Sequence, residues 1–430
     1  MTLQPSTPYN GFPEISGYTI VEQLYHGSRT AVYRATENNT KCSVAIKVLQ
    51  NEYPSFNELV QFRNQYAIAV NLHIDGIIRP KSLKLWKNSY ALIMEDCGSI
   101  SLQQYCQENA LTLENNLEIA IQLTEILAKL HQNRVIHKDI KPANILINPD
   151  TKQVKLIDFS ISSLLPRETQ QIQNPNVLEG TLAYISPEQT GRMNRGIDYR
   201  SDFYSLGITL YELLTGELPF QSNDPMELVH CHIAKMPEVL KTGRDGDGEI
   251  GGEEIPQILS EIVMKSMAKN AEDRYQSALG LKYDLEQCLS QYQQTGKIKT
   301  FELGKRDICD RFIIPEKLYG REKEVAQLLA AFERVANPPK SPQGDVGNSE
   351  MMLVAGFSGI GKTAVVNEVH KPIVRQRGYF IKGKFDQFNR NIPFSAFVQA
   401  FRELMGQLLS ETDTQLQEWK DKILATLGEN

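Results

Sequence analysis

The sequence lacks several features that mark special classes of protein. Its six cysteines form no CxxC pair and no cluster with histidine, so we expect neither a zinc site nor a disulfide framework, and a reducing compartment. It has no run of about 18 apolar residues, and its N-terminus lacks a basic region followed by an apolar one. Neither a membrane-spanning helix nor a signal peptide is therefore expected. Excess positive charge is also missing, since the net charge is −6, so nothing indicates nucleic acid or direct membrane insertion. The expectation is a cytoplasmic protein.

The chain does have the length and composition of about two or three globular domains. It contains 430 residues, of which 41% are hydrophobic and 23% charged. Residues 1–17, with three prolines and two glycines, are predicted to be a flexible lead-in. Residues 57–72 repeat apolar side chains at helical spacing, with Asn57 as the expected N-cap. Strand patterns occur in five segments, namely YTIVEQLY, AVYRA, SVAIKVL, IIRPKSLKLW and SYALIMED.

After Gly98 the pattern becomes that of amphipathic helices, as in LENNLEIAIQLTEILAKLHQ and SDFYSLGITLYELLTG. A small β-rich lobe joined to a larger helical lobe is an α+β, bilobal arrangement with a cleft at the junction. Helical periodicity ends near Tyr292, and residues 291–317 read as an extended connector.

Two motifs in the helical part carry the chemistry of phosphoryl transfer, the sequences HKDIKPAN and DFS. Transfer from ATP needs an oriented hydroxyl, Mg²⁺ bridging the phosphates, and cations for the developing charge. Asp139 can accept the proton of the substrate hydroxyl, and Lys141 can reach the γ-phosphate. Asn144 and Asp158 supply the hard oxygen donors that Mg²⁺ prefers.

These motifs resemble those of the protein kinase family, and the likeness extends through the small lobe. Lys47 in VAIK matches the lysine that holds the α- and β-phosphates, and it completes the catalytic set. The segment MEDC matches the hinge, where backbone groups of Glu95 and Cys97 are implied to pair with adenine. The resemblance implies that the nucleotide contacts are Gly27, Val32, Ala45, Lys47, Glu95, Cys97 and Leu146.

The resemblance also assigns roles in the large lobe. Glu188 of SPE and Arg274 of DRYQS match a glutamate–arginine ion pair, and Asp202 matches an aspartate that braces the catalytic loop. Lys141 and Thr181 match the family's serine/threonine pattern, which implies Ser/Thr acceptors on protein substrates. Acceptors for autophosphorylation within this chain are expected at Ser162, Ser163 and Thr169.

Each of these residues, taken singly, also has a structural interpretation. Lys47 could be an exposed strand residue and Asp202 a helix N-cap, and His137 is expected to be a core clamp rather than a proton carrier. The ordered set of motifs favours the functional interpretation.

The sequence departs from the family pattern at three places. The glycine-rich loop, YHGSRTAV, keeps only Gly27 of three glycines. Gln65 stands where a glutamate normally pairs with Lys47, and Ser160 and Lys138 replace a glycine and an arginine. An active kinase is the main prediction because the base and metal-binding residues are complete. A pseudokinase scaffold that binds ATP and signals by conformation is the alternative.

A second nucleotide motif, GFSGIGKT, follows the predicted strand MMLVA and opens a predicted helix. In such a P-loop, backbone amides face phosphate, as at Gly356 and Gly361, Lys362 reaches the far phosphate, and Thr363 offers Mg²⁺ a hydroxyl. A glycine-rich turn with an incidental lysine is the structural alternative. No hydrophobic strand ending in acidic residues follows, so the module is expected to be an incomplete α/β P-loop domain without ATPase activity, and a P-loop signalling switch is the third functional alternative.

The whole chain resembles the N-terminal part of large bacterial, cyanobacterial-type signalling proteins that join a Ser/Thr kinase to an AAA-like ATPase, sensor and histidine-kinase modules. The resemblance is carried by NPNVLEGTLAYISPEQTGRMNRGIDYRSDFYSLG and DRFIIPEKLYGREKEVAQLLAAFERV. It implies a kinase domain at 18–290 and an AAA-like module, truncated here, at 318–430. ATP and Mg²⁺ are the implied cofactors, and the implied partners are protein substrates and downstream signalling modules absent from this chain.

Overall fold

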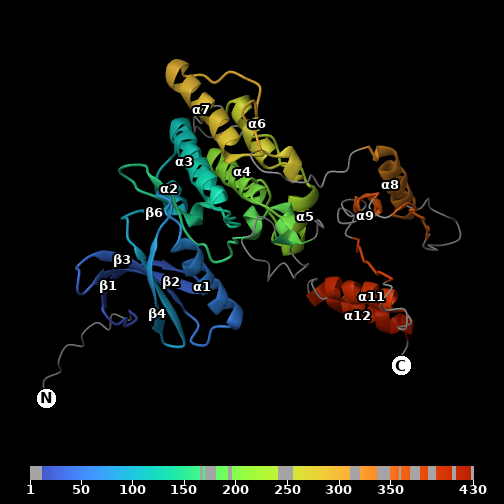
Figure 1. The fold of residues 1–430 in the computed structure, drawn as a ribbon, viewed down its shortest axis with the longest axis horizontal. Coiled ribbons are helices and arrows are strands. Elements are labelled where there is room, and N and C mark those ends of the chain that lie inside the picture. The colour runs from blue at the N-terminus through green and yellow to red at the C-terminus, as the bar shows by residue number, and fades with distance from the viewer. Residues whose placement is uncertain are drawn as a thin grey trace, which may run out of the picture. The chain divides into compact units, whose positions relative to one another are not determined.

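The computed structural model describes residues 12–164, 168–169, 181–191, 196–240, 255–309, 320–336, 349–357, 360–368, 378–385, 394–408 and 413–427. The chain divides after Leu164 into two compact units, whose helices and strands are labelled in Figure 1. The first holds the predicted small lobe together with the catalytic motifs, and the second holds the helices of the large lobe and the C-terminal module.

An antiparallel sheet of five strands forms the small lobe, in the order β1-β2-β3-β5-β4. The strands span β1 (Tyr18–His26), β2 (Thr30–Glu37), β3 (Ser43–Leu49), β4 (Pro80–Trp86) and β5 (Ser89–Glu95). All five predicted strands are therefore confirmed. Helix α1 (Phe56–Ala69) packs on β4 and β5. Its N-cap is Ser55, which forms a capping box with Glu58. The helix therefore begins slightly earlier than predicted, since Asn57 was the expected N-cap.

The sheet buries one face in a compact core, and the chain before β1 belongs to this core. Ile15 is 6% exposed, the Phe12 and Tyr33 rings meet edge to face, and the indole nitrogen of Trp86 donates to the Glu14 carbonyl at 2.9 Å. The expectation of a flexible lead-in is thus wrong for residues 12–17, because their apolar side chains cover the outer face of the sheet. Residues 1–11 lie outside the described part of the chain.

The rest of the first unit positions the catalytic motifs. Its helices are α2 (Leu102–Glu108) and α3 (Leu113–Gln132), and its strands β6 (Ile100–Ser101), β7 (Ile145–Ile147) and β8 (Val154–Leu156) form a second small sheet. Thr112 caps α3, which packs its apolar face on β8. The HKDIKPAN motif therefore links a long buried helix to a sheet, and the DFS motif follows the last strand of that sheet.

The described part of the second unit before the connector contains the short strands β9 (Glu168–Thr169) and β10 (Gly196–Ile197) and a group of longer helices. These are α4 (Arg200–Thr215), α5 (Pro225–Ala234), α6 (Gln257–Ser266) and α7 (Ala278–Thr295), with α6 packed between α4 and α7. Helix α7 runs to Thr295, beyond the predicted start of the connector at 291.

The described part of the connector is attached to α7 rather than free. The Asp307 carboxylate accepts hydrogen bonds from the backbone of Gln276 and Ser277, at 2.8–3.0 Å, and so adds to the N-cap of α7. A Cβ on Gly280 would lie 2.5 Å from this carboxylate, so the close approach requires glycine. Gly304, with φ +75°, donates to the buried Asp284 carboxylate at 2.8 Å.

The C-terminal module is described as helices α8 (Glu322–Ala336), α9 (Lys362–Asn367), α11 (Ser395–Leu408) and α12 (Asp413–Leu427). The predicted strand MMLVA is not confirmed: the described residues 349–357 form no β-pairing, and the side chains of Met351 and Leu353 are 96% and 90% exposed. A parallel strand exists only with paired neighbours, and the described stretches on either side supply none.

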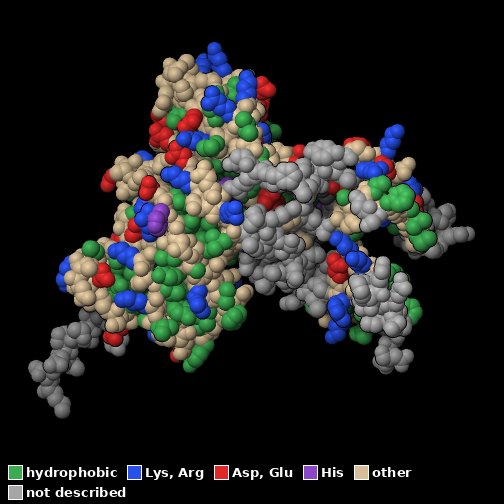
Figure 2. Space-filling model, in the orientation of Figure 1, with side chains coloured by type: hydrophobic (Ala, Val, Ile, Leu, Met, Phe, Trp, Pro, Cys, Tyr) green, Lys and Arg blue, Asp and Glu red, His purple; other side chains and the backbone are tan. Residues whose placement is uncertain are grey.

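No helix in the described part of the chain is both long and apolar enough to span a membrane. On the face in view, hydrophobic side chains gather over the small lobe, while acidic and basic side chains are interspersed (Figure 2). Exposed hydrophobic residues of this lobe include Tyr53, Phe56, Val60 and Leu85.

Candidate active site

The catalytic loop forms a closed set of hydrogen bonds around the Asp139 carboxylate. Asp139 Oδ2 accepts from Lys141 Nζ at 2.7 Å and from Asn144 Nδ2 at 2.7 Å, and Asn144 Nδ2 also donates to the Asp139 carbonyl at 2.9 Å. Lys138 precedes this aspartate with φ +70°, a left-handed conformation that is costly for a lysine and typical of functional loops. Three of the predicted catalytic residues are thus brought together, with the Asp139 side chain only 12% exposed.

His137 supports the loop from the interior. Its side chain is fully buried, its Nε2 lies 3.0 Å from the Ile157 carbonyl, and its ring meets Phe159 edge to face at 5.0 Å. Ile157 and Phe159 flank Asp158, so the histidine ties the two catalytic motifs together. The predicted role of His137 as a structural clamp is confirmed.

Lys47 joins the sheet, helix α1 and the DFS motif at one point. Its Nζ lies 3.0 Å from Asp158 Oδ2 and donates to Gln65 Oε1 at 3.0 Å. Lys47 and Gln65 are 8% and 5% exposed, so their contact is shielded from water, whereas the Asp158 side chain is 28% exposed. The predicted pairing of Gln65 with Lys47 is confirmed, and the alternative of Lys47 as an exposed strand residue is wrong.

The Asp158 carboxylate is ionised at neutral pH. Burial, the largest single influence, acts to raise its pKa, but the Lys47 ammonium together with hydrogen bonds from Lys47 and the Ser160 side chain outweighs burial and lowers the pKa to about 2. Asp158 also has a left-handed φ of +67°. The residue is held in a strained conformation with its charge aimed at Lys47.

Asn64 is a site residue that sequence reasoning missed. Its side-chain amide donates to the Ser160 carbonyl at 3.2 Å and to the Ser162 carbonyl at 3.0 Å, which holds the DFS segment against helix α1. The sequence signal that could have indicated this role is the asparagine itself, because asparagine is a weak helix former and Asn64 lies inside helix α1, next to Gln65.

One expected phosphate acceptor is not accessible in this structure. Ser162 is 4% exposed, and its hydroxyl donates to the His137 carbonyl at 3.0 Å. The expectation for Ser162 is therefore wrong for this conformation, because its hydroxyl is part of the core. The side chain of Thr169 lies outside the described part of the structure.

The predicted adenine slot lies on the Lys47 face of the sheet. Val32 pairs across the strands with Lys47, and Ala45 lies two residues before Lys47, so the three share one face. Leu146 lies on β7, half-buried. Glu95 ends β5, and its carboxylate is 2.9 Å from Lys155 Nζ.

The hinge after β5 is anchored to the sheet. Asp96 accepts from Ser43 Oγ at 2.6 Å, Arg34 Nε at 2.7 Å and the Gly98 amide at 3.1 Å. Burial opposes ionisation of Asp96, but these hydrogen bonds outweigh it and lower its pKa. Cys97 follows, with its thiol 3.2 Å from Ser99 Oγ. Fixed side chains on both sides leave the hinge backbone in a defined position.

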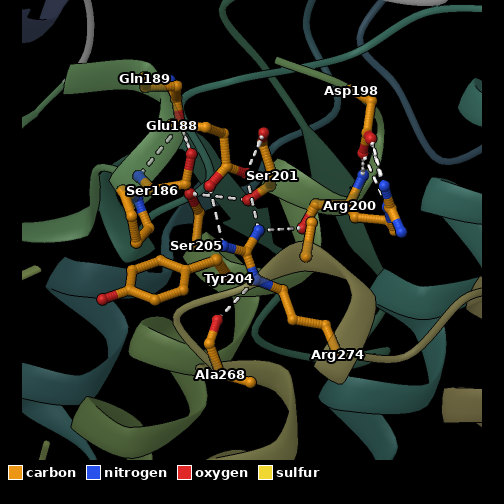
Figure 3. A network of polar contacts seen from close by, with 12 residues as sticks. Ser186, Glu188, Gln189, Asp198, Arg200, Ser201, Tyr204, Ser205, Ala268 and Arg274 are labelled. Atoms are coloured by element: carbon orange, nitrogen blue, oxygen red, sulfur yellow. Dashed lines mark hydrogen bonds and ion pairs between the residues drawn. The ribbon is translucent and has the colours of Figure 1, made fainter. Parts of the chain in front are cut away.

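In the second unit, the predicted Glu188–Arg274 pair is confirmed (Figure 3). The two groups form a two-pronged contact, with nitrogen–oxygen distances of 2.7 and 2.8 Å, and Ser201 Oγ donates to the same carboxylate at 2.6 Å. Arg274 also donates to the Ala268 carbonyl, so the pair ties the SPE segment to the region after α6. Burial, the largest single influence, acts to raise the pKa of Glu188, but the charge and hydrogen bonds of Arg274 and the hydrogen bond from Ser201 together outweigh it and lower the pKa to about 2.

Asp202 is fully buried in the first turn of α4, and Thr181 precedes a short 3-10 helix at Leu182–Tyr184. The expected contacts of these two residues with the catalytic loop stay predictions.

The described part of the P-loop motif shows its lysine folded onto the loop. Lys362 Nζ donates to the carbonyls of Gly356 and Phe357 at 2.7 and 2.8 Å. Gly361, with φ +95°, caps α9, and Thr363 is exposed in its first turn. Residues 358–359 of the motif lie outside the described part of the chain. The helix expected after the motif is confirmed over Lys362–Asn367, and residues 369–374 of the expected helix lie outside the described part of the chain.

Comparison with known families agrees with this geometry. The model described as protein kinase domain matches residues 18–285, and the model described as AAA ATPase domain matches residues 317–430. The chain belongs to the protein kinase family. Its kinase domain has the expected β-rich and helical parts, and an AAA-type P-loop region follows.

Three known proteins are similar in sequence to parts of this chain. Hybrid signal transduction histidine kinase G of Dictyostelium discoideum is 34% identical over 401 residues, covering 73% of this chain and 11% of that protein. Serine/threonine-protein kinase PrkC of Bacillus subtilis is 32% identical over 278 residues, covering 63% and 40%. Serine/threonine-protein kinase PknB of Mycobacterium tuberculosis is 31% identical over 276 residues, covering 62% and 42%. The chain spans less than half the length of each of these relatives.

Proposed function

We propose that this chain is an active protein kinase that transfers the γ-phosphoryl group of ATP to Ser or Thr hydroxyls of proteins. The observation that carries the proposal is the assembled set in the first unit, where Lys47 contacts Asp158 and Gln65 while Lys141 and Asn144 hold Asp139. A scaffold that only binds nucleotide has no need of an oriented base. The names of PrkC and PknB support Ser/Thr acceptors.

Each residue has a defined role in this proposal. Asp139 Oδ2 accepts the proton of the acceptor hydroxyl, and Lys141, 2.7 Å from it, offsets charge on the transferred group. Lys47 contacts the α- and β-phosphates. Its ammonium has three donor hydrogens, and the contacts with Gln65 and Asp158 leave one of them for phosphate. Backbone groups of Glu95 and Cys97 bind adenine between Val32, Ala45 and Leu146.

The residues present fit Mg²⁺. The pKa of about 2 keeps Asp158 charged, and the amide nitrogen of Asn144 is committed to Asp139, so its oxygen is the atom left for a cation. When bound, Mg²⁺ would neutralise the phosphates. We also propose a cytoplasmic location, supported by six cysteines that are all free thiols.

The test compares phosphate transfer from labelled ATP by the wild type, Asp139→Asn and Asp150→Asn, with phosphosites mapped by mass spectrometry and casein as an added acceptor. Asp150 is an exposed aspartate in the turn before β8 and serves as the matched control. We expect Asp139→Asn to lower transfer by about a thousandfold with ATP affinity retained, and Asp150→Asn to match the wild type. A wild type that binds ATP and transfers nothing would establish the pseudokinase scaffold instead.

A further inference from the structure

Gln50, the residue directly after β3, holds the loop between β1 and β2 from outside the cleft. Its backbone N–H donates to the Arg29 carbonyl at 2.9 Å, and its side-chain nitrogen donates to the carbonyls of Gly27 at 2.6 Å and Thr30 at 3.2 Å. The turn itself is closed by Gly27 N–H donating to the Thr30 carbonyl at 3.0 Å. Three of the carbonyls in this loop therefore converge on one residue.

The direction of these carbonyls fixes the direction of the loop's amides. In a planar trans peptide, the C=O of one residue and the N–H of the next point in opposite directions. Because Gln50 holds the carbonyls of Gly27 and Arg29, the N–H groups of Ser28 and Thr30 are turned away from Gln50. Backbone N–H groups presented together in a loop are the groups that bind phosphate.

The Gln50 amide is itself fixed in orientation. Its nitrogen donates to the Gly27 and Thr30 carbonyls and also lies 3.0 Å from His26 Nδ1, so three polar atoms surround two donor hydrogens. A flipped amide would place Oε1 against two carbonyl oxygens, which is unfavourable. The side-chain amide therefore acts as a directional contact and not as a space-filling one.

On the opposite side, Tyr25 packs against the same loop. Tyr25 pairs with Val32, which pairs with Lys47, so the phenol ring lies on the cleft face of the sheet. A Cβ on Gly27 would lie 2.4 Å from the Tyr25 hydroxyl. Tyr25 stands where the first of the family's three glycines would be, and Gly27 is the glycine that its ring requires.

We propose that Gln50 is the positioning residue that gives this loop, which keeps one glycine of three, a phosphate-binding conformation. The inference rests on the proposed function, since it concerns the same ATP site. The Gln50 side-chain amide holds the Gly27 carbonyl and its backbone N–H holds the Arg29 carbonyl, so both carbonyls face outward and the phosphates of ATP meet the N–H groups that this orientation presents. Adenosine, which lacks phosphates, does not use the contact.

The test measures binding of a non-hydrolysable ATP analogue with Mg²⁺, and of adenosine, by calorimetry on the full chain. The variants are Gln50→Leu, which removes the amide at similar size, and Gln50→Glu, which places acceptor oxygens against the loop carbonyls. Gln104→Leu is the matched control, because Gln104 is an exposed glutamine on α2 that pairs with Glu108. We expect about tenfold weaker binding of the analogue in Gln50→Leu and a larger loss in Gln50→Glu, with adenosine affinity within about twofold of the wild type.

The outcomes separate this inference from the proposed function. Equal weakening of the analogue and adenosine would mean a general effect on the small lobe and would overturn the inference, as would unchanged binding of both. A wild type that binds neither ligand would refute the proposed function and the inference with it. A wild type that binds the analogue while Gln50→Leu binds it equally well would refute the inference alone.

Discussion

The contact between Lys47 and Gln65 gives the sharpest test of how this kinase site works without the usual glutamate. The Nζ–Oε1 distance is 3.0 Å, and the two residues are 8% and 5% exposed, so the hydrogen bond is formed in a water-poor setting. Hydrogen bonds to charged groups contribute about 1.5–3 kcal/mol. If about 2 kcal/mol of this is expressed in the transition state, Gln65→Leu lowers kcat/KM for ATP by about 30-fold.

The companion variant Gln65→Glu restores the charge. A carboxylate at this position strengthens the hold on Lys47, but Asp158 already lies 3.0 Å from the same ammonium. Two carboxylates that share one cation repel each other, so we expect activity from equal to at most about tenfold higher.

The assay is kcat/KM for ATP at a saturating concentration of an acceptor protein, with the thermal unfolding midpoint as a check on folding. Gln65→Leu with wild-type kinetics would show that the contact plays no part in catalysis. A large loss in Gln65→Glu would show that the added carboxylate draws Lys47 away from the phosphates. Either result would refute the reasoning.

Two further predictions concern the second unit. Glu188→Gln leaves Arg274 buried without a counter-charge and should lower the free energy of unfolding by about 3–5 kcal/mol near pH 7. Folding lowers the pKa of Glu188 from 4.5 to about 2, so its contribution to stability is complete above about pH 4.5 and is lost as the pH falls towards 2. In denaturant titrations, the difference in unfolding free energy between the wild type and Glu188→Gln should therefore be smaller near pH 3.5 than near pH 7. A difference that does not change with pH contradicts this. Lys362→Ala should leave phosphate transfer within about twofold of the wild type, because the groups proposed to transfer phosphate lie in the first unit and Lys362 does not. ATPase activity that survives Asp139→Asn and disappears in Lys362→Ala would show a working ATPase.

The clustering of the candidate catalytic residues could be predicted because these residues lie at short, ordered spacings. Asp139, Lys141 and Asn144 lie within six residues, and the structure closes them into one set of hydrogen bonds. The Glu188–Arg274 pair, separated by 86 residues, was predictable only through the family resemblance. No periodicity in the sequence indicates a contact over that distance.

What could not be predicted depends on loops that have no periodic pattern. The packing of residues 12–17 rests on hydrogen bonds from the Trp86 indole to Glu14 and from the Asn38 N–H to Gly17, with a few apolar contacts. The connector rests on the Asp307 carboxylate at the start of α7. Proline and glycine in such segments indicate irregular structure but not its location. The predicted strand MMLVA is not confirmed for a different reason. Its apolar pattern indicates a strand, but no described segment pairs with it.

The three departures from the family pattern share a physical solution. Where the family's glutamate is missing, the Gln65 amide contacts Lys47. Where the DFG glycine is missing, the Asn64 amide donates to the Ser160 carbonyl. Where the loop glycines are missing, the Gln50 amide donates to the Gly27 carbonyl. Side-chain amides do not titrate, and each offers a directional hydrogen bond without the desolvation cost of a second buried charge. The site thus keeps its net charge in the few groups proposed to act on phosphate and proton, and uses neutral groups to hold them in place. A loss of activity in the amide variants should therefore leave the pH dependence of the remaining activity unchanged, because the groups that ionise are the same.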